Sequence, residues 1–483
     1  MYSVKDSNEA SLYDFSNLYF IGIGGSGMGP LAEYVYRCGK KVSGYDLRSS
    51  STTEYLGSLG IPVCYDISEA QTYLGAIKEP LLVIISSAIR EDNPLLVQVK
   101  SNPNITICHR YDLISYLCNR QTLLSVAGTH GKTTTSAMLA FTLIKLKQDP
   151  SYIIGGKLLG SSHLSRKGGS DLIVAEVDES DGSILKYTPW ISVLTNIEED
   201  HLDYYKTLDK EKEAFYSYLD HTKPGGSLVV FDQVELPYYL LKKEGSTLAS
   251  VITYGYSKKS SIYIEKIEQN QGSMNFFLNI KGTSYTSSIK MFGKHNILNI
   301  CAVVGVCLTL GIDPVTSLEA LKEYPGVKRR MNLVIETEYN NHKIKVYDDY
   351  AHNPGKIRAA ILGIREAFPN YSLKVLYEPH RYSRLETMAE ETLSSFSQAD
   401  TVYVFPVYSA GESCSDPDLY STSNIGQKIS KYSEVNTIPL MQNETILDKI
   451  SIEDIKTDTI FVSLGAGDIT VQASLLGHYL KLI

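Results

Sequence analysis

Residues 128–135 read Gly-Thr-His-Gly-Lys-Thr-Thr-Thr, and this octet constrains the fold more than any other stretch of the chain. An apolar run typical of a buried strand, residues 123–127, precedes the octet, and a helix-like segment, residues 136–144, follows it. A strand, a glycine-containing turn and a helix start with Gly-Lys-Thr together describe a phosphate-binding loop, with the phosphate at a helix N-terminus. The octet therefore predicts a nucleotide site in an α/β domain.

The chemistry of this loop depends on three kinds of group. Backbone N–H groups would hold phosphate oxygens, the Lys132 ammonium would draw off charge, and the Thr133 hydroxyl could ligate Mg²⁺. Val126 stands where the general pattern has its first glycine, so a tight turn that happens to contain Gly-Lys-Thr is the simpler alternative. The predicted nucleotide-binding residues of the loop are Gly128, Thr129, His130, Gly131, Lys132, Thr133 and Thr134.

The length of 483 residues is too great for one hydrophobic core. We predict three α/β domains in series: a Rossmann-like domain (1–118), a central P-loop domain with a mainly parallel sheet (119–325) and a Rossmann-like C-terminal domain (326–483). The hydrophobic content of 43% and the charged content of 21% are those of an ordinary soluble globular protein.

Charge and cysteine usage narrow the class of protein further. A net charge of −8 argues against nucleic acid or a membrane surface as the main partner. The seven cysteines show no metal-ligand spacing and fit reduced thiols in a cytosol. The first ten residues contain no apolar signal core, so we expect a cytoplasmic protein.

The first domain opens with a second phosphate-binding pattern. A strand at 18–23 leads into Gly22-x-Gly24-x-x-Gly27, a helix at 28–38 and a strand at 41–46 that ends in Asp46. Further strands fit 63–64 and 81–85. The pattern suits a nicotinamide-dependent oxidoreductase, but a simple dehydrogenase has no need for the second loop at 128–135. The same turn could equally seat the diphosphate of a uridine-diphosphate sugar.

In the second domain, acidic residues follow two predicted strands. The strand at 171–178 ends in Glu176-Val-Asp-Glu-Ser-Asp181, and the strand at 191–197 is followed by Glu198, Glu199, Asp200 and His201. Buried carboxylates need a partner or a metal, so Thr133, Glu176 and His201 are candidate Mg²⁺ ligands. His201 is unusual because Mg²⁺ prefers oxygen. A solvated acidic loop is the alternative.

Short alternating strands separated by turns predict an antiparallel meander over 260–292, and a helix should follow at 295–310. His295 and Asn296 open that helix, where an amide could recognise an adenine edge or simply cap the helix. Arg330 lies in a basic Lys-Arg-Arg run at a domain junction. It could clamp a phosphoryl oxygen as domains close, or the run could be a solvated turn.

The third domain places polar motifs after several predicted strands. The strands fit 343–347, 372–377, 401–405 and 459–463, and helices fit 354–368 and 385–396. Residues 348–354, 380–384 and 465–468 follow successive strands and point to a shared cleft. Arg381 and Arg384, three apart on a helix start, could grip a carboxylate.

Taken in order, these motifs resemble those of the Mur ligases. The matching segments are 22–28, 86–94, 128–133, 176–181, 195–198, 200–203, 295–296, 326–330, 348–352, 379–384 and 465–468. The resemblance implies ATP-dependent phosphorylation of the lactyl carboxylate of UDP-N-acetylmuramate to an acyl phosphate. An amino acid then attacks this acyl phosphate in peptidoglycan precursor synthesis. His130 in the loop and the His-Arg-Tyr-Ser-Arg run at 380–384 favour L-alanine as the amino acid.

The resemblance also implies roles for individual residues. Lys132, His201, Arg330 and His352 match catalytic positions, and His352 would assist deprotonation of the amine. ATP would be bound by the loop with His295, Asn296, Arg330 and Asp349. Mg²⁺, or Mn²⁺ in its place, would be held by Thr133, Glu176 and His201. The substrate-binding positions are Gly24, Gly25, Ser26, Gly27, Met28, Asp46, Ser87, Glu179, Ser180, His352, His380, Arg381 and Arg384.

Three residues depart from the family pattern. Asn353 stands where a second histidine is usual, and Pro30 and Tyr45 stand where smaller residues are usual. The expected partners are small molecules, with no nucleic acid and no membrane, and the chain would be a monomer or homodimer. A muropeptide-recycling ligase, an oxidoreductase and a P-loop ATPase or kinase that makes no amide are the alternatives.

Overall fold

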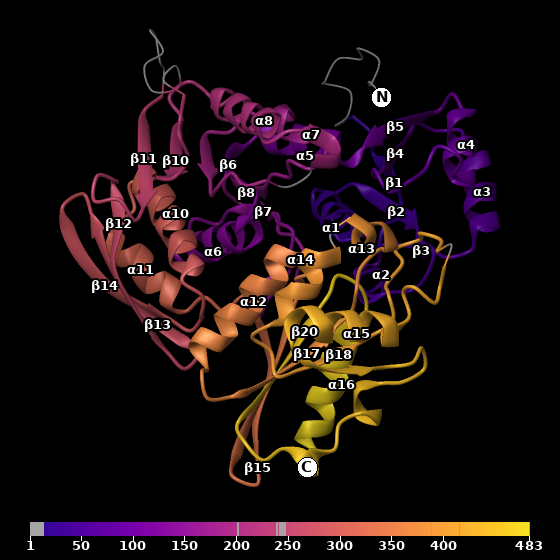
Figure 1. The fold of residues 1–483 in the computed structure, drawn as a ribbon. Coiled ribbons are helices and arrows are strands. Elements are labelled where there is room, and N and C mark those ends of the chain that lie inside the picture. Colours follow the sequence, from indigo (N-terminus) through magenta and orange to yellow (C-terminus); the bar gives the residue numbers. More distant parts are fainter. Residues whose placement is uncertain are drawn as a thin grey trace. The chain divides into compact units, whose positions relative to one another are not determined.

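The computed structural model describes residues 14–199, 202–237, 240, 248–387, 389–414 and 416–482. The chain divides into two compact units (Figure 1). The first consists of Met1–Lys266, Phe276–Ser287 and His295–Pro325, and the second of Ile267–Asn275, Ser288–Lys294 and Gly326–Ile483. Each unit is built from helices packed on mainly parallel sheets, as the sequence predicts.

A five-stranded parallel sheet with the order β3-β2-β1-β4-β5 begins the first unit. Its strands are β1 (Asn17–Ile21), β2 (Lys41–Tyr45), β3 (Val63–Cys64), β4 (Leu81–Ile85) and β5 (Ile105–His109). Its helices are α1 (Met28–Arg37), α2 (Ser51–Ser58), α3 (Ile67–Gly75), α4 (Pro94–Lys100) and α5 (Arg110–Asn119). Every residue of β4 is apolar and buried, as expected for a strand covered on both faces.

A nine-stranded sheet with the order β14-β13-β12-β11-β10-β9-β6-β8-β7 follows along the chain. Its strands are β6 (Thr122–Ala127), β7 (Ser151–Ile153), β8 (Leu172–Glu176), β9 (Ile191–Leu194), β10 (Ser227–Phe231), β11 (Ser250–Gly255), β12 (Ile262–Asn270), β13 (Ser273–Ile280) and β14 (Thr283–Ile289). The predicted meander is confirmed, because the neighbouring strands β12, β13 and β14 are joined by two-residue turns that reverse the chain.

The helices of this region are α6 (Lys132–Lys145), η2 (Ser183–Lys186), α7 (Leu202–Tyr205), α8 (Leu208–Asp220), α10 (His295–Thr309) and α11 (Pro314–Lys322). The predicted buried helix after the meander is α10, in which residues such as Ile300, Val303 and Cys307 are inaccessible to solvent. Within the described ranges, no helix combines the length and the apolar character needed to cross a membrane.

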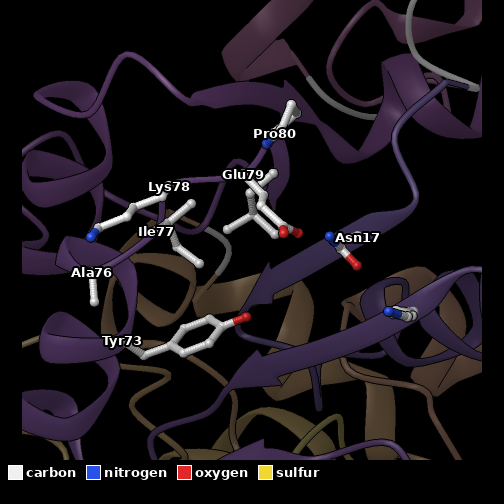
Figure 2. A pocket seen from close by; sticks show the side chains of 9 residues that line it. Asn17, Tyr73, Ala76, Ile77, Lys78, Glu79 and Pro80 are labelled. Carbon is white, nitrogen blue, oxygen red and sulfur yellow. The ribbon is translucent and has the colours of Figure 1, made fainter.

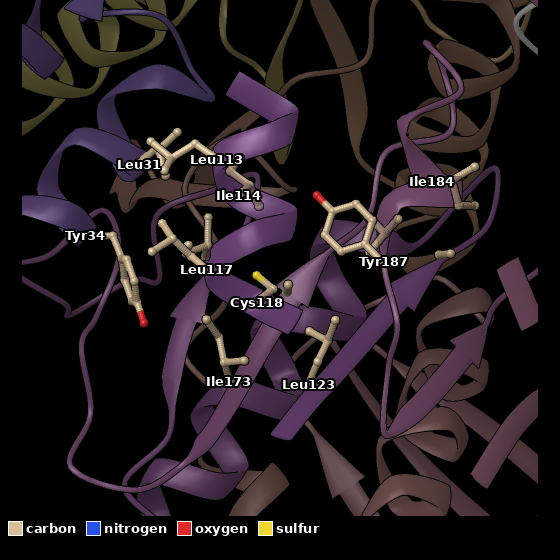
Figure 3. Packing of buried hydrophobic residues seen from close by; sticks show 14 of the residues in the cluster. Leu31, Tyr34, Leu113, Ile114, Leu117, Cys118, Leu123, Ile173, Ile184 and Tyr187 are labelled. Atoms are coloured by element: carbon tan, nitrogen blue, oxygen red, sulfur yellow. The ribbon is translucent and has the colours of Figure 1, made fainter. Parts of the chain in front are cut away.

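One hydrophobic core extends over the first two sheets (Figure 3). Leu31 of α1 and Cys118 of α5 belong to the same buried cluster as Leu123 of β6 and Ile173 of β8. A hydrogen bond adds to this apolar contact, because Gln121 Nε2 donates to Tyr34 Oη at 2.9 Å. The helices α1 and α5 therefore pack against elements of both sheets.

The second unit contains a six-stranded sheet with the order β15-β16-β20-β17-β18-β19. Its strands are β15 (Asn332–Tyr339), β16 (His342–Asp349), β17 (Ser372–Tyr377), β18 (Thr401–Val404), β19 (Asn436–Pro439) and β20 (Thr459–Leu464). Its helices are α12 (Pro354–Ala367), α13 (Tyr382–Thr387), α14 (Ala389–Leu393), η3 (Ser394–Phe396), α15 (Thr422–Ser433), η4 (Ile446–Asp448), η5 (Ile452–Asp454) and α16 (Ile469–Lys481). Among the described strand pairings of this sheet, only the β15–β16 pair is antiparallel.

Three features of this unit differ from the sequence prediction, the first being that α15 and α16 were not among the predicted helices. The helix expected over 385–396 is divided into α13, α14 and η3. The strands β15 and β19 were not predicted, because both lie at sheet edges and neither presents the continuous apolar run of a central strand.

Candidate active site

The phosphate-binding loop joins β6 to α6. The helix begins at Lys132, so Gly-Lys-Thr lies at the helix start as predicted, and Lys132 and Thr133 lie in its first turn. Gly131 precedes the helix in a left-handed conformation with φ of 83°. A Cβ built on Gly128 would collide with Thr195 Oγ1. The loop can therefore approach Thr195 this closely only because residue 128 is glycine.

The loop is fastened to the end of the neighbouring strand β9. The His130 N–H donates to Asn196 Oδ1 at 2.9 Å, and Thr195 Oγ1 donates to the His130 carbonyl at 2.6 Å. The Glu198 N–H also donates to Thr129 Oγ1 at 2.9 Å. The sequence analysis gave Thr195 and Asn196 no role in the site. Their position after a strand beside the loop's own strand was the available signal.

Lys132 is held by an ion pair with Glu179. Its Nζ donates to Glu179 Oε1 at 2.7 Å and to the Gly128 carbonyl at 2.6 Å. The Glu179 side chain is 1% exposed. Burial alone would lower the pKa of Lys132, but the charge and hydrogen bond of Glu179, together with the charges of Glu176 and Asp178, raise it overall. The ammonium therefore stays charged at the mouth of the loop, and the residue expected to bind substrate, Glu179, contacts Lys132 instead.

Two oxygen donors meet beside the loop at the predicted metal position. Thr133 Oγ1 donates to Glu176 Oε1 at 2.9 Å, and the Gly155 N–H donates to Glu176 Oε2 at 2.7 Å. Glu176 is the last residue of β8. A hydroxyl and a carboxylate are hard oxygen ligands of the kind that Mg²⁺ prefers, so both residues fit this ion.

The third predicted ligand, His201, lies outside the described residues. Among the residues that the structure does describe, no three His, Cys, Asp or Glu side chains gather as a metal-binding group. Few protein ligands are usual for Mg²⁺ at phosphate sites, because phosphate oxygens and water complete its coordination. The neighbouring Ser180 donates its N–H to Asp178 Oδ1 at 3.1 Å, which shapes the turn after β8.

In the first sheet, the predicted substrate residues gather where β1, β2 and β4 end. Asp46 follows β2, and its Oδ2 accepts the Gly24 N–H at 2.7 Å. The exposed backbone of the turn precedes α1, whose first residue, Met28, is 3% exposed. Ser87 is exposed just beyond β4, which pairs with β1.

Arg110 is a residue of this region that the sequence analysis missed. It is the first residue of α5, directly after β5. Its Nη1 lies 2.5 Å from the position that a Cβ on Gly27 would occupy. A guanidinium therefore packs against the glycine turn, where it can attract an anionic group. A basic residue immediately after a strand of the same sheet was the signal that could have found it.

A depression of about 250 Å³ lies at the opposite edge of the first sheet (Figure 2). Asn17, Lys41 and Leu81 line it, and each of these residues begins a strand. None of the predicted site residues belongs to its lining. In parallel α/β sheets, ligands bind beyond the carboxyl ends of the strands, so this depression does not match the predicted site.

In the second unit, Asp349 organises the backbone at the end of β16. Its Oδ2 accepts the Met331 N–H at 2.8 Å and its Oδ1 accepts the Ala351 N–H at 2.8 Å. Desolvation raises the pKa of Asp349 despite the opposing charge of Arg330. The Arg330 guanidinium lies 5.5 Å from the Tyr350 ring centroid. The structure thus brings the predicted residues Arg330 and Asp349 together.

Two predicted histidines, His352 and His380, lie with their ring centroids 5.5 Å apart. His352 Nδ1 donates to the Tyr350 carbonyl at 2.7 Å, which leaves Nε2 as the unprotonated nitrogen of a neutral ring. Burial lowers the pKa of His352 to about 3. Burial and the charge of Arg384 lower the pKa of His380 to about 4. Both rings are therefore neutral at pH 7.

The expectation that Arg381 and Arg384 share one face of a helix start is wrong. The helix α13 begins at Tyr382, and Arg381 precedes it in a left-handed conformation with φ of 64°. The Arg381 N–H donates to the Tyr408 carbonyl at 2.9 Å, which turns the chain before the helix. Arg384 lies in the helix, with its Nη1 3.4 Å from His380 Nδ1.

Glu378 was also missed by the sequence analysis. It follows β17, and its carboxylate accepts the N–H groups of Gly467 at 2.9 Å and Asp468 at 3.0 Å. Burial raises the pKa of Glu378 to about 7. This contact fastens the glycine-containing turn at 465–468 to the end of the neighbouring strand.

The two residues predicted to recognise adenine, His295 and Asn296, are the first residues of α10 and differ in exposure. His295 is exposed, whereas Asn296 is buried and its Oδ1 accepts from Asn299 Nδ2 at 3.1 Å. Asn299 Oδ1 in turn accepts from Thr135 Oγ1 at 3.1 Å. This pair of amides therefore supports α6 just behind the phosphate loop.

Comparison with known proteins decides the family. The Mur ligase family, catalytic domain matches residues 17–122, the Mur ligase middle domain matches 126–307, and the Mur ligase glutamate ligase domain matches 329–467. The chain belongs to the Mur ligase family. This membership removes the basis of the oxidoreductase alternative, because both phosphate-binding patterns lie within Mur ligase domains.

Individual Mur ligases are similar over nearly the whole length. The UDP-N-acetylmuramate–L-alanine ligase of Desulfotalea psychrophila is 35% identical over 460 residues, covering 95% of this chain and 96% of the relative. The crystal structure of UDP-N-acetylmuramate-alanine ligase from Thermotoga maritima has a TM-score of 0.80 at 28% identity, covering 97% and 100%. A murein peptide ligase from Psychrobacter arcticus shares the fold, with a TM-score of 0.69 at 21% identity over 97% and 99%.

The structure explains Asn353 and Tyr45, two of the three departures from the Mur ligase pattern, and gives no reason for Pro30. Asn353 caps α12, because its Oδ1 accepts the Lys356 N–H at 2.9 Å. The Pro30 carbonyl accepts from Ser165 Oγ at 2.7 Å, and Tyr45 is buried among apolar residues of the first sheet. In these described contacts, none of the three side chains touches the phosphate loop.

Proposed function

We propose that this Mur ligase uses ATP to join L-alanine to the lactyl carboxylate of UDP-N-acetylmuramate and releases ADP and phosphate. The observation that carries the proposal is the charged Lys132 held in the phosphate loop beside the Thr133–Glu176 pair. The similarity to UDP-N-acetylmuramate–L-alanine ligases supports this substrate and this amino acid. The product would be a peptidoglycan precursor.

The first step proposed is transfer of the γ-phosphoryl group. A lactyl carboxylate oxygen attacks the γ-phosphorus, the bond to the bridging oxygen breaks, and ADP leaves with the electron pair. Loop N–H groups and Lys132 hold the phosphate oxygens and offset the charge that develops. Thr133 and Glu176, with His201, would hold Mg²⁺, which supplies charge neutralisation at the phosphates when bound.

The second step proposed is amide formation. The alanine nitrogen attacks the carbonyl carbon of the acyl phosphate, and the tetrahedral intermediate collapses with loss of phosphate and a proton. Arg384 and His380 are proposed to hold the alanine carboxylate, with Arg381 nearby. A pKa of about 3 makes His352 a weak base, so we propose that its Nε2 accepts a hydrogen bond from the amine.

The remaining substrate groups would be bound in the first sheet and at α10. The turn at 24–28, with Ser87, would seat the uridine diphosphate, and Asp46 holds that turn in shape. Arg110 would add a positive charge at the diphosphate. His295, Asn296, Arg330 and Asp349 are proposed for the nucleotide. Glu179 and Ser180 are proposed to act by shaping the mouth of the loop.

The domain assignment 1–118, 119–325 and 326–483 belongs to this proposal, as do a cytoplasmic location and a monomer or homodimer. We expect small-molecule partners only.

The test is release of ADP by the purified protein with ATP, UDP-N-acetylmuramate and one amino acid at a time. L-Alanine should give the highest kcat/KM, with glycine and serine lower and a tripeptide inactive. Preference for the tripeptide would instead establish a muropeptide-recycling ligase. ADP release that needs neither sugar nor amino acid would establish an ATPase. Mass spectrometry of the product should show one alanine added to the sugar nucleotide.

A further inference from the structure

Glu33 is a buried residue whose two carboxylate oxygens both accept hydrogen bonds. It lies in α1 and is inaccessible to solvent. Its Oε1 accepts from Arg37 Nε at 2.8 Å and from the Tyr55 hydroxyl at 2.7 Å. Burial and the bond to Glu33 raise the pKa of Tyr55 to about 12, so the phenol remains a donor. A carboxyl group is buried in this way only when such contacts replace its hydration.

The other carboxylate oxygen of Glu33 binds a segment that belongs to the second sheet. Its Oε2 accepts the N–H groups of Leu164 at 2.7 Å and Ser165 at 3.1 Å. These residues lie in the connection between β7 and β8. Ser165 Oγ adds a bond to the Pro30 carbonyl at 2.7 Å. One side chain of α1 thus fixes a loop of the neighbouring sheet, and α1 also contacts β7.

From this loop, hydrogen bonds continue to the proposed metal ligands. Tyr152 of β7 exchanges two backbone hydrogen bonds with Arg166, at 2.8 and 3.1 Å. The chain then leaves β7 and reaches Gly155, whose N–H donates to Glu176 Oε2 at 2.7 Å. Glu176 Oε1 accepts from Thr133 at 2.9 Å, in the first turn of α6. The position of the loop therefore bears directly on the orientation of the Glu176 carboxylate.

At its other end, α1 begins directly after the glycine turn. Met28 is its first residue, and Glu33 lies five residues further, about one and a half helical turns along a rigid element. A displacement of the turn would move α1 and with it Glu33. The apolar core shared by the two sheets holds α1 against the second sheet, but apolar packing is not directional. The four hydrogen bonds to the Glu33 carboxylate are directional and therefore fix the orientation of α1 relative to the 164–165 loop.

We propose that Glu33 is a positioning residue that couples occupation of the glycine turn to the arrangement of Glu176 and Thr133 at the nucleotide. The inference rests on the proposed function, because it takes the UDP-sugar to occupy the turn and Mg·ADP to occupy the loop. Binding of either ligand should then change the affinity for the other by the same factor.

The experiment measures the Kd of Mg·ADP by isothermal titration calorimetry, with and without saturating UDP-N-acetylmuramate. The ratio of the two Kd values is the coupling factor. It is compared in the unaltered protein, in Glu33→Gln and in Glu69→Gln. Glu69 is an exposed glutamate of α3, a helix that packs on the same sheet as α1. Glutamine keeps the shape of Glu33 but turns an NH₂ group toward two donors.

We expect a coupling factor of about fivefold or more in the unaltered protein and in Glu69→Gln. In Glu33→Gln it should fall to within about twofold of unity, while the Kd of Mg·ADP alone changes by less than about twofold. An unchanged coupling factor in Glu33→Gln, or none in the unaltered protein, overturns the inference. Absence of any UDP-sugar binding to the unaltered protein would instead overturn the proposed function.

A milder variant protects the test against misfolding. Tyr55→Phe removes one donor to Glu33 and leaves the Leu164 and Ser165 contacts in place. Its coupling factor should lie between those of the unaltered protein and Glu33→Gln, with circular dichroism unchanged. A coupling factor in Tyr55→Phe equal to that of the unaltered protein, with Glu33→Gln unfolded, would count against the proposal.

Discussion

Two regions of the molecule use opposite electrostatic arrangements. One is the phosphate loop, and the other is a polar cluster of the second unit that follows β16 and β17 and consists of His352, Glu378, His380, Arg381 and Arg384. In the loop, Lys132 is kept charged by the buried carboxylate of Glu179. In the second unit, burial keeps His352 and His380 neutral and raises the pKa of Glu378 to about 7. Desolvation acts in both places, but at Lys132 the neighbouring carboxylates, with Glu179 in direct contact, together outweigh it. The loop is therefore suited to phosphate, and the cluster is suited to groups that exchange protons.

Lys132→Met should have the largest effect. We expect kcat/KM to fall by about 10³-fold or more, because the charge that stabilises the transferring phosphoryl group is lost. The free energy of unfolding should fall by about 3 kcal/mol, because the buried Glu179 carboxylate loses its ion pair with Lys132. Steady-state ADP release and chemical denaturation measure the two effects.

Two further variants separate these effects. Lys132→Met combined with Glu179→Gln should recover much of the stability but none of the activity. Lys145→Met, on the exposed face of the same helix, removes a surface pair with Glu323 and should change the free energy of unfolding by less than about 1 kcal/mol. Activity retained in Lys132→Met would contradict the role of the loop.

Glu378→Gln should change how stability depends on pH. The folded-state pKa of about 7 lies above the ordinary 4.5, so the protonated form stabilises the fold below about pH 4.5. That stability is lost as the pH rises through 7, by about 3 kcal/mol in total. Denaturation of the unaltered protein and the variant between pH 4.5 and 8 should show a difference that varies with pH. Glu338→Gln, exposed on β15, should show none.

Glu176→Gln tests the oxygen ligands beside the loop. Replacing one carboxylate oxygen with an amide should lower kcat about 100-fold at a fixed Mg²⁺ concentration. It should also raise the Mg²⁺ concentration needed for half-maximal activity. Asp171→Asn, just before the other end of β8, is the matched control and should leave the Mg²⁺ titration unchanged. The same Mg²⁺ curve in both variants would remove Glu176 from the proposed ligand set.

Thr195→Val should have the smallest effect. It removes the donor to the His130 carbonyl, and the loss of this hydrogen bond destabilises the ATP-binding conformation of the loop by about 1 kcal/mol. The KM for ATP should therefore rise about fivefold, with kcat little changed. Ser192→Ala, in β9 just before Thr195 but bonded to Thr222, should leave KM unchanged. A fall in kcat with unchanged KM would show that Thr195 acts in the reaction step and not in loop positioning.

The loop and the cluster also differed in how well sequence reasoning described them. The loop is contiguous in the chain, so its strand, turn and helix start were predicted from local pattern. In the cluster, the helical spacing of Arg381 and Arg384 was wrong, because a left-handed backbone at Arg381 delays the helix. That conformation depends on the Tyr408 carbonyl, 27 residues away in the sequence, which no local pattern reveals.

The amino-acid sequence by itself determined the order of the α/β modules, the phosphate loop and the position of Glu176 at a strand end, because apolar periodicity and glycine placement act over a few neighbouring residues. Only the tertiary structure decided the partners of the charged groups: Glu179 for Lys132, the 467–468 backbone for Glu378, and the Leu164–Ser165 backbone for Glu33. These contacts join residues 47 to 132 positions apart. The sheet order brings them together, and burial then makes each contact strong.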